Sequence, residues 1–91
     1  MIWQAEVRVM LKPSVNDPQG QSIRGALHSL GFDPISSVRA GKLFELQLEA
    51  PDRATAEATI ERACQQLLAN PVIETYSFEL SHAADPALRP G

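Results

Sequence analysis

Residues 2–12, IWQAEVRVMLK, alternate between apolar and polar side chains along their whole length. The apolar face consists of Trp3, Ala5, Val7, Val9 and Leu11, and the polar face includes Gln4, Glu6, Arg8 and Lys12. A period of two residues is typical of a β-strand with one buried face and one solvated face. The strand is expected to end at Lys12-Pro13, because proline donates no ladder hydrogen bond.

Two segments further along the chain have the pattern of an amphipathic helix. The first, residues 18–30, follows the N-cap carboxylate of Asp17, has Pro18 at its first position and ends at a C-cap, Gly31. The second begins at Pro51-Asp52 and stops at Asn70-Pro71. The expected buried stripes are Ile23, Ala26, Leu27 and Leu30 in the first helix, and Ala56, Ile60, Ala63, Cys64, Leu67 and Leu68 in the second.

Between the helices, the sequence predicts a hairpin. Residues 35–40 form a weak strand, and Gly41-Lys42 turns the chain into a clearer strand over residues 43–50. Phe44 and Leu46 alternate there with polar neighbours, so one face of this strand is expected to be buried.

The last strand is expected over residues 72–80, with Tyr76 and Phe78 on one face. The resulting order, β-α-β-β-α-β, predicts a ferredoxin-like α+β fold: a two-layer sandwich with two helices on one face of an antiparallel sheet. Residues 1–80 form one domain, and residues 81–91, which have few bulky side chains, are expected to be a disordered tail.

Composition excludes several classes of function. The 91 residues contain 8 Lys plus Arg and 11 Asp plus Glu, and the formal charge of −3 disfavours binding to nucleic acid or an anionic membrane. The N-terminus has no secretory pattern, and no apolar run approaches the roughly 20 residues of a membrane helix. The single cysteine excludes an internal disulfide and suits a reducing cytosol. We expect a cytoplasmic protein, and its short chain favours self-association.

Few side chains are arranged for catalysis. The only histidines, His28 and His82, lie on different elements, and no third residue completes a nucleophilic or metal site. Cys64 lies in an apolar stripe, where packing explains it better than reactivity. The loop of residues 12–20 is placed to receive an anion, but a turn and a cap explain it better, and it is neither a Walker loop nor the phosphate loop of an acylphosphatase.

Five short segments occur in the order and at the spacing of a known family. They are Leu11-Lys12, Asp17-Pro18-Gln19-Gly20, Gly31-Phe32, Arg39-Ala40-Gly41-Lys42 and residues 67–74, LLANPVIE. Through these segments, residues 3–80 resemble the PurS family of small subunits, found where phosphoribosylformylglycinamidine synthase is divided into three chains.

The resemblance implies a role in purine biosynthesis. In this family a glutaminase, PurQ, releases ammonia, and a synthetase, PurL, uses ATP and Mg to convert formylglycinamide ribonucleotide into its amidine. The small subunit brings the two together, so the resemblance implies a noncatalytic assembly subunit that binds no cofactor itself. It also implies a dimer or tetramer, in which the last strand pairs either within its own chain or, by exchange, with a neighbour.

The matched segments and the last strand give two groups of candidates and no catalytic residue. Turns and caps explain the first group: Asp17, Pro18, Gly20, Gly31, Gly41, Asn70 and Pro71. The second group is expected at a subunit interface: Lys12, Lys42, Val72, Glu74, Tyr76 and Phe78. Of these, Lys12, Lys42 and Glu74 are the hardest to explain by folding alone.

A second interpretation stays open, because a fold of this type hosts many functions. It is a small regulatory domain that binds an amino acid or a nucleotide at a dimer interface. A thermal shift with such ligands distinguishes the two interpretations, because a ligand that binds only the native state raises its apparent stability.

Overall fold

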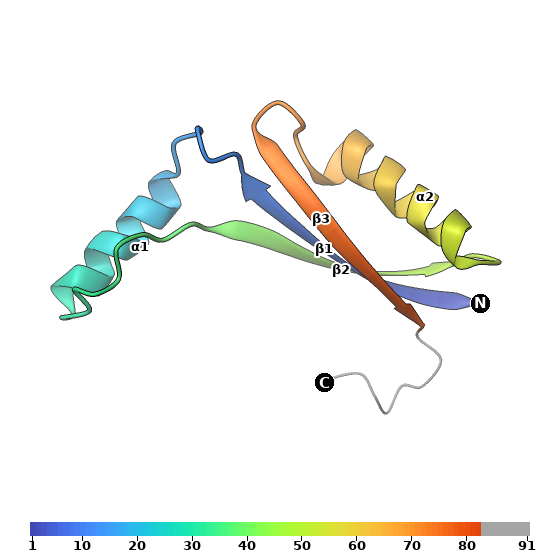
Figure 1. The fold of residues 1–91 in the computed structure, drawn as a ribbon, viewed down its shortest axis with the longest axis horizontal. Helices are drawn as coiled ribbons and strands as arrows, with labels where there is room; N and C mark the ends of the chain where they lie inside the picture. Colours follow the sequence, from blue (N-terminus) through green and yellow to red (C-terminus); the bar gives the residue numbers. More distant parts are fainter. Residues whose placement is uncertain (83–91) are drawn as a thin grey trace.

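The first strand, β1 (Ile2–Leu11), lies in the centre of the sheet. The computed structural model describes residues 1–82, and within them β1 is flanked by β2 (Gly41–Glu49) and β3 (Glu74–His82), both antiparallel to it (Figure 1). In this register Val7 lies opposite Phe44 on one side and opposite Phe78 on the other. The alternation of the first strand therefore places one apolar row across the whole width of the sheet.

The second helix, α2 (Arg53–Ala63), and the π-helical turn that continues it, η1 (Cys64–Leu68), pack on this apolar face. Ile60 and Cys64 are buried there against the apolar side chains of β1. Partly buried side chains of the flanking strands complete the core: Phe44, Leu46, Leu48, Tyr76, Phe78 and Leu80. The predicted α+β class, with an antiparallel sheet and a helical layer, is confirmed.

The end of this helix departs from the predicted stripe. The Ala69 N–H donates to the carbonyl oxygen of Cys64, five residues earlier, at 3.0 Å. Such a turn is wider than an α-helical one and shifts the positions of the side chains around the axis. Cys64 and Leu68 therefore remain against the core, while Leu67 is 83% exposed. The predicted burial of Leu67 is wrong.

The weak strand predicted over residues 35–40 is not a strand in the structure. Its backbone bonds to side chains instead of to a neighbouring strand, since the Ala40 N–H donates to Asp17 and the Ser36 carbonyl oxygen accepts from Arg24. Backbone groups that are satisfied in this way have no need of a sheet ladder. The described residues accordingly follow the order β-α-β-α-β, with one strand fewer than predicted.

Gly41 is the first residue of β2 and lies opposite Met10, so it does not form the predicted hairpin turn. A Cβ atom at Gly41 would overlap the Val9 carbonyl oxygen and the Met10 sulfur. Close approach of two strands, rather than a turn, therefore explains this glycine.

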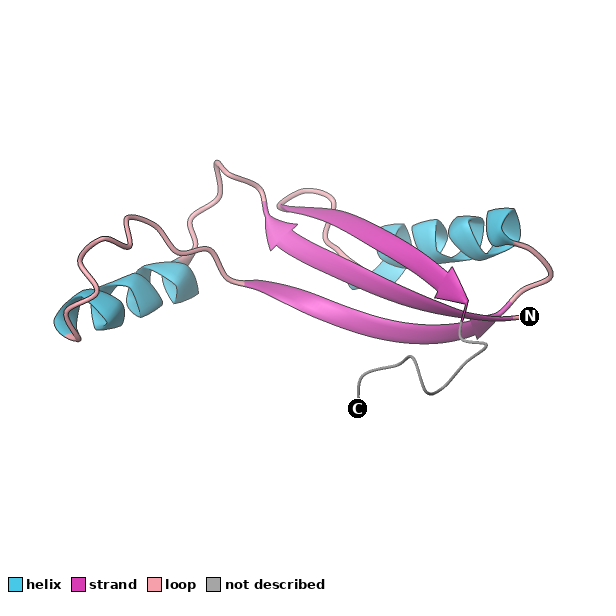
Figure 2. Cartoon of the chain, turned by 60° about the horizontal axis from the view of Figure 1, so that its bottom comes forward, coloured by secondary structure: helices cyan, strands magenta, loops and turns pink. Residues whose placement is uncertain are grey.

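The first helix, α1 (Pro18–Ser29), does not lie on the sheet. Figures 1 and 2 show it beyond the end of the sheet, beside the segment that leads back to β2. We call residues 18–40 the arm. The prediction that both helices cover one face is wrong for α1, because contacts from Asp17 and Arg24 to residues 35–40 tie the arm to itself.

Trp3 is packed at the end of the sheet opposite the arm. Its indole is buried, and Nε1 donates to the Ala50 carbonyl oxygen at 3.3 Å. The ring of His82, the last residue of β3, lies 4.2 Å from the indole between centroids. The guanidinium carbon of Arg53 lies 5.6 Å from the same indole, within the range of a cation–π contact.

β3 extends to His82, two residues beyond the domain boundary predicted at residue 80. Ser81 and His82 therefore belong to the sheet, and the rest of the predicted tail, residues 83–91, lies outside the described residues. Among the described helices, none has the length and apolar character needed to cross a membrane.

Candidate subunit interface

The arm presents apolar side chains that residues 1–82 leave exposed. Ile23, Leu30 and Phe32 are 40%, 73% and 51% exposed, although the sequence predicts the stripe of Ile23 and Leu30 to be buried. Burying one such side chain contributes about 1.5–3 kcal/mol. A group of exposed apolar side chains along one helix face is a candidate surface for contact with another protein.

The end of α1 keeps this surface in a fixed shape. Gly31 has a φ of +95°, and its N–H donates to the His28 carbonyl oxygen at 3.0 Å. The Phe32 N–H donates to the Leu27 carbonyl oxygen at 2.9 Å. These two bonds form a Schellman motif, which confirms the predicted glycine C-cap and places Phe32 beside the last turn of the helix.

The base of the arm is held by Asp17. Its carboxylate accepts from the N–H of Gly20 at 3.0 Å and from the N–H of Ala40 at 2.9 Å, and the residue is 8% exposed. The backbone N–H of Gly20, then that of Ala40, holds the pKa of Asp17 below its usual value. A Cβ at Gly20 would overlap the Val38 carbonyl oxygen. The predicted roles of Asp17 as cap, Pro18 at the helix start and Gly20 as a backbone requirement are confirmed.

Lys42 and Glu74 have partners in their own chain, which the sequence did not indicate. Glu74 Oε1 accepts from the Asn70 N–H at 2.7 Å, and Glu74 Oε2 lies 3.7 Å from Lys42 Nζ. Asn70 Oδ1 accepts from the Val72 N–H at 3.0 Å, so the turn at Asn70-Pro71 is confirmed. A local role in this turn thus accounts for Glu74, and contact of either residue with another subunit stays a prediction.

The other four interface candidates differ in how much surface they offer. Val72 lies in the turn before β3 rather than in the strand, and it is 76% exposed. Tyr76 and Phe78 are partly buried under α2, and the Tyr76 hydroxyl donates to Glu61 Oε1 at 2.7 Å, which raises the pKa of Tyr76. The backbone of Lys12 donates to the Ile73 carbonyl oxygen at 2.8 Å. Val72 is therefore the most accessible of the four.

The only cysteine and the two histidines lie on three different elements: His28 on α1, Cys64 on η1 and His82 on β3. Cys64 is fully buried, and burial raises the pKa of its thiol. His28 Nε2 lies 2.7 Å from the Ile35 carbonyl oxygen and helps to close the arm. Within residues 1–82, no group of three or more His, Cys, Asp or Glu side chains is arranged to hold a metal ion.

The sheet has two free edges. β2 and β3 each pair with β1 on one side only, so their outer backbone groups have no partner strand within residues 1–82. Unpaired strand edges are templates for pairing with another chain. The sequence predicted an interface at the last strand but not one at the arm. An amphipathic pattern identifies the apolar face of a helix, but it does not tell whether that face packs on the chain's own sheet or on another chain.

Comparison with known proteins assigns this arrangement to a family. The family model described as "PurS: Phosphoribosylformylglycinamidine (FGAM) synthase" matches residues 4–82. A phosphoribosylformylglycinamidine synthase subunit PurS of Synechocystis is 48% identical over 88 residues, which span 97% of this chain and 87% of the relative. The PurS subunit of Bacillus subtilis is 42% identical over 87% of this chain and 93% of its own.

Solved structures share the fold. The structure of B. subtilis PurS matches with a TM-score of 0.80 at 41% identity, covering 88% of this chain and 99% of that one. A chain in the structure of PurLQS from Thermotoga maritima matches with a TM-score of 0.83 at 30% identity, covering 89% of this chain and 99% of that one.

Proposed function

The chain belongs to the PurS family of phosphoribosylformylglycinamidine synthase subunits, and on this premise we propose that it is the assembly subunit that joins the glutaminase PurQ to the synthetase PurL. The observation that carries the proposal is its likeness, over almost the whole of both chains, to a chain of PurLQS. In this role the chain enables ammonia released by PurQ to reach PurL, which converts formylglycinamide ribonucleotide into its amidine.

We further propose that the chain contributes no active site of its own. The burial of its only cysteine and the separation of its two histidines support this division of labour. ATP and Mg are then used by PurL, and this chain binds neither. We propose that the complex acts in the cytoplasm.

Self-association is the second part of the proposal. The exposed apolar side chains of the arm and the free outer edge of β3 support a dimer or a tetramer. β3 pairs with β1 of its own chain from Glu74 to His82, so completing this sheet needs no strand exchange. In the last strand region we assign to the interface the exposed side chain of Val72 and the outer backbone edge of β3 at Tyr76 and Phe78, whose side chains pack under α2.

A reconstituted synthase assay tests the assembly role. PurL and PurQ are combined with and without this chain, with glutamine and then with ammonium as the nitrogen source. We expect loss of glutamine-dependent turnover without the chain, while ammonium-dependent turnover continues. Full glutamine-dependent activity without it would refute the assembly role.

A further inference from the structure

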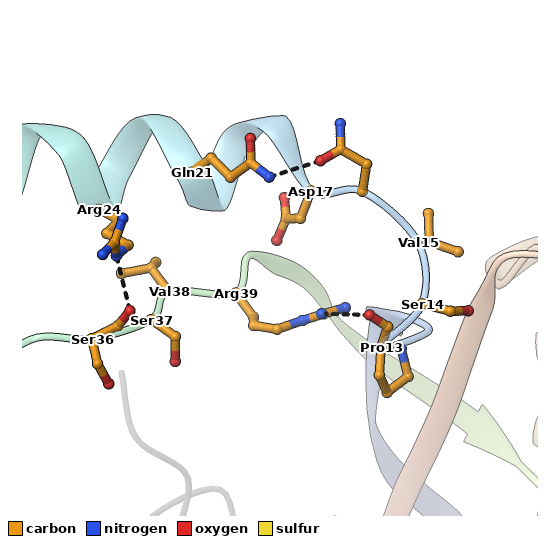
Figure 3. Close-up of a pocket in the computed structure, with 11 residues that line it drawn as sticks. Pro13, Ser14, Val15, Asp17, Gln21, Arg24, Ser36, Ser37, Val38 and Arg39 are labelled. Atoms are coloured by element: carbon orange, nitrogen blue, oxygen red, sulfur yellow. Dashed lines mark hydrogen bonds between the residues drawn. The ribbon is translucent and has the colours of Figure 1, made fainter.

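An open cavity of about 480 Å³, lined by both polar and apolar side chains, lies at the base of the arm. Three segments form its walls: the loop of residues 13–17, the first half of α1, and residues 36–39 (Figure 3). Its volume is within the range of ligand-binding pockets. The side chains that give it its chemistry are Arg24, Arg39, Ser14, Ser36, Ser37 and Asp17.

Only one of the three guanidinium nitrogens of Arg24 is hydrogen-bonded within the described residues. Its Nε donates to the Ser36 carbonyl oxygen at 2.8 Å, across the cavity wall in Figure 3. Its two terminal nitrogens make no hydrogen bond or ion pair within the described residues. A guanidinium fixed at Nε presents its remaining N–H groups as a planar fork, which matches the oxygens of a phosphate.

Arg39 supplies a second fixed positive charge. Its Nη2 donates to the carbonyl oxygens of Leu11 at 2.6 Å and Lys12 at 3.1 Å, and Nη1 lies 3.5 Å from that of Pro13. Carbonyl oxygens carry no net charge, so these contacts hold the side chain in place without neutralising it. Arg39 thus raises the electrostatic potential of the cavity.

The remaining polar side chains of the lining add hydrogen-bond donors to the cavity. The hydroxyls of Ser14, Ser36 and Ser37 form no hydrogen bond with the rest of residues 1–82, so each is available as a donor. The one carboxylate in the wall, Asp17, already accepts two backbone N–H groups. The lining therefore carries one net positive charge in a chain whose formal charge is −3.

We propose that this cavity binds a phosphate monoester, with Arg24 contacting the phosphate oxygens. Pro13, Val15 and Val38 add apolar surface to the same walls, which suits a ligand with an organic part attached to the phosphate. The site is separate from the apolar surface of the arm, and it does not depend on the assembly role.

Thermal shift and calorimetry on the purified full-length chain test this site. The probes are inorganic phosphate and ribose 5-phosphate, each at about 10 mM against chloride of equal ionic strength. The variants are Arg24→Gln and, as a matched control, Arg62→Gln, since Arg62 lies exposed on α2 and has no ion pair in the described region. Circular dichroism of each variant without ligand establishes that it is folded.

We expect at least one probe to bind the unchanged chain and the Arg62→Gln variant, and binding to Arg24→Gln to be about tenfold weaker or lost. Tighter binding of ribose 5-phosphate than of inorganic phosphate supports a phosphate monoester, and equal or weaker binding of ribose 5-phosphate would overturn the monoester as the ligand class. If Arg24→Gln fails to fold, Ser37→Ala replaces it and is expected to weaken binding as well. No binding, or equal binding by the Arg24 and Arg62 variants, would overturn the proposal.

Discussion

The carboxylate of Asp17 accepts a hydrogen bond from the backbone N–H of Ala40, 23 residues further along the chain, at 2.9 Å. The same side chain caps α1 through the N–H of Gly20. One residue thus joins the start of the arm to the start of β2, and its removal frees two backbone donors at once.

Replacing Asp17 with Asn is expected to lower Tm by about 4–8 °C, the shift that the loss of one hydrogen bond, about 1 kcal/mol, gives in a domain of this size. The amide has only one acceptor oxygen, so it cannot accept from both N–H groups as the carboxylate does. Differential scanning calorimetry measures the change. Asn16→Ala in the same loop is the control, and an equal loss of Tm in both variants would contradict the role of Asp17.

The pH dependence of stability follows from the same contacts. The folded-state pKa of Asp17 lies below its unfolded value of about 3.9, so its stabilisation is present above that pH. It is lost as pH falls through the folded-state pKa. We expect the difference in stability between the unchanged chain and Asp17→Asn to be constant near pH 7 and to shrink below about pH 4. Urea unfolding at several pH values measures it, and a pH-independent difference would refute it.

Replacing Leu30 with Glu is expected to weaken self-association about tenfold or more without unfolding the chain. Leu30 is 73% exposed on the arm, so the change removes apolar surface from the interface and not from the core. Sedimentation velocity measures the oligomer. Leu67→Glu is the matched control, because Leu67 is another exposed leucine, at 83%, but lies on η1. Dissociation by the control alone would place the interface at η1, and a monomeric unchanged chain at micromolar concentration would refute self-association.

Substitutions of Lys42 and Glu74 distinguish a role in the stability of this chain from a role in contact with another subunit. Lys42 is 61% exposed, so Lys42→Met is expected to change stability by less than about 1 kcal/mol. Glu74→Ala also removes the acceptor of the Asn70 N–H, and we expect it to cost about 1 kcal/mol more. Urea unfolding measures both. If Lys42→Met leaves stability unchanged but impairs glutamine-dependent synthase activity, Lys42 contacts another subunit; unchanged activity would refute that contact.

Cys64 is expected to react with a thiol reagent only when the chain unfolds. The side chain is fully buried and its thiol has a raised pKa, so the folded state offers almost no thiolate. Labelling rates measured across a urea series should therefore follow the unfolding transition. Complete labelling of the folded chain, with an unchanged circular dichroism spectrum, would contradict this prediction.

Local patterns predicted the elements that depend on neighbouring residues. The alternation around Val7 gave the central strand, and Asp17 and Gly31 gave both ends of α1. The prediction failed for residues 35–40, where long-range bonds to Asp17 and Arg24 replace a ladder. Sequence periodicity does not indicate hydrogen bonds between residues so far apart in the chain. For the same reason it did not predict that the apolar side chains of the arm are exposed.

The surroundings of the interface candidates were also not predictable from local sequence patterns. The exposure of Val72 and the pairing of Lys42 with Glu74 both depend on how the turn at Asn70 brings β3 beside β1. Leu67 lies outside the core because the hydrogen bond from the Ala69 N–H to the Cys64 carbonyl oxygen widens the last helical turn and rotates the side chains around the axis. Composition alone does not distinguish this turn from an α-helical one.

The stacking of His82 on Trp3 gives the chain an optical probe of its own. Trp3 is the only tryptophan, and it lies where the last residue of β3 meets the first turn of α2, beneath Arg53. Its emission therefore reports whether the C-terminal strand is docked on β1. Mixing this chain with a binding partner while recording that emission shows, without any attached dye, whether assembly leaves the strand in place or draws it away.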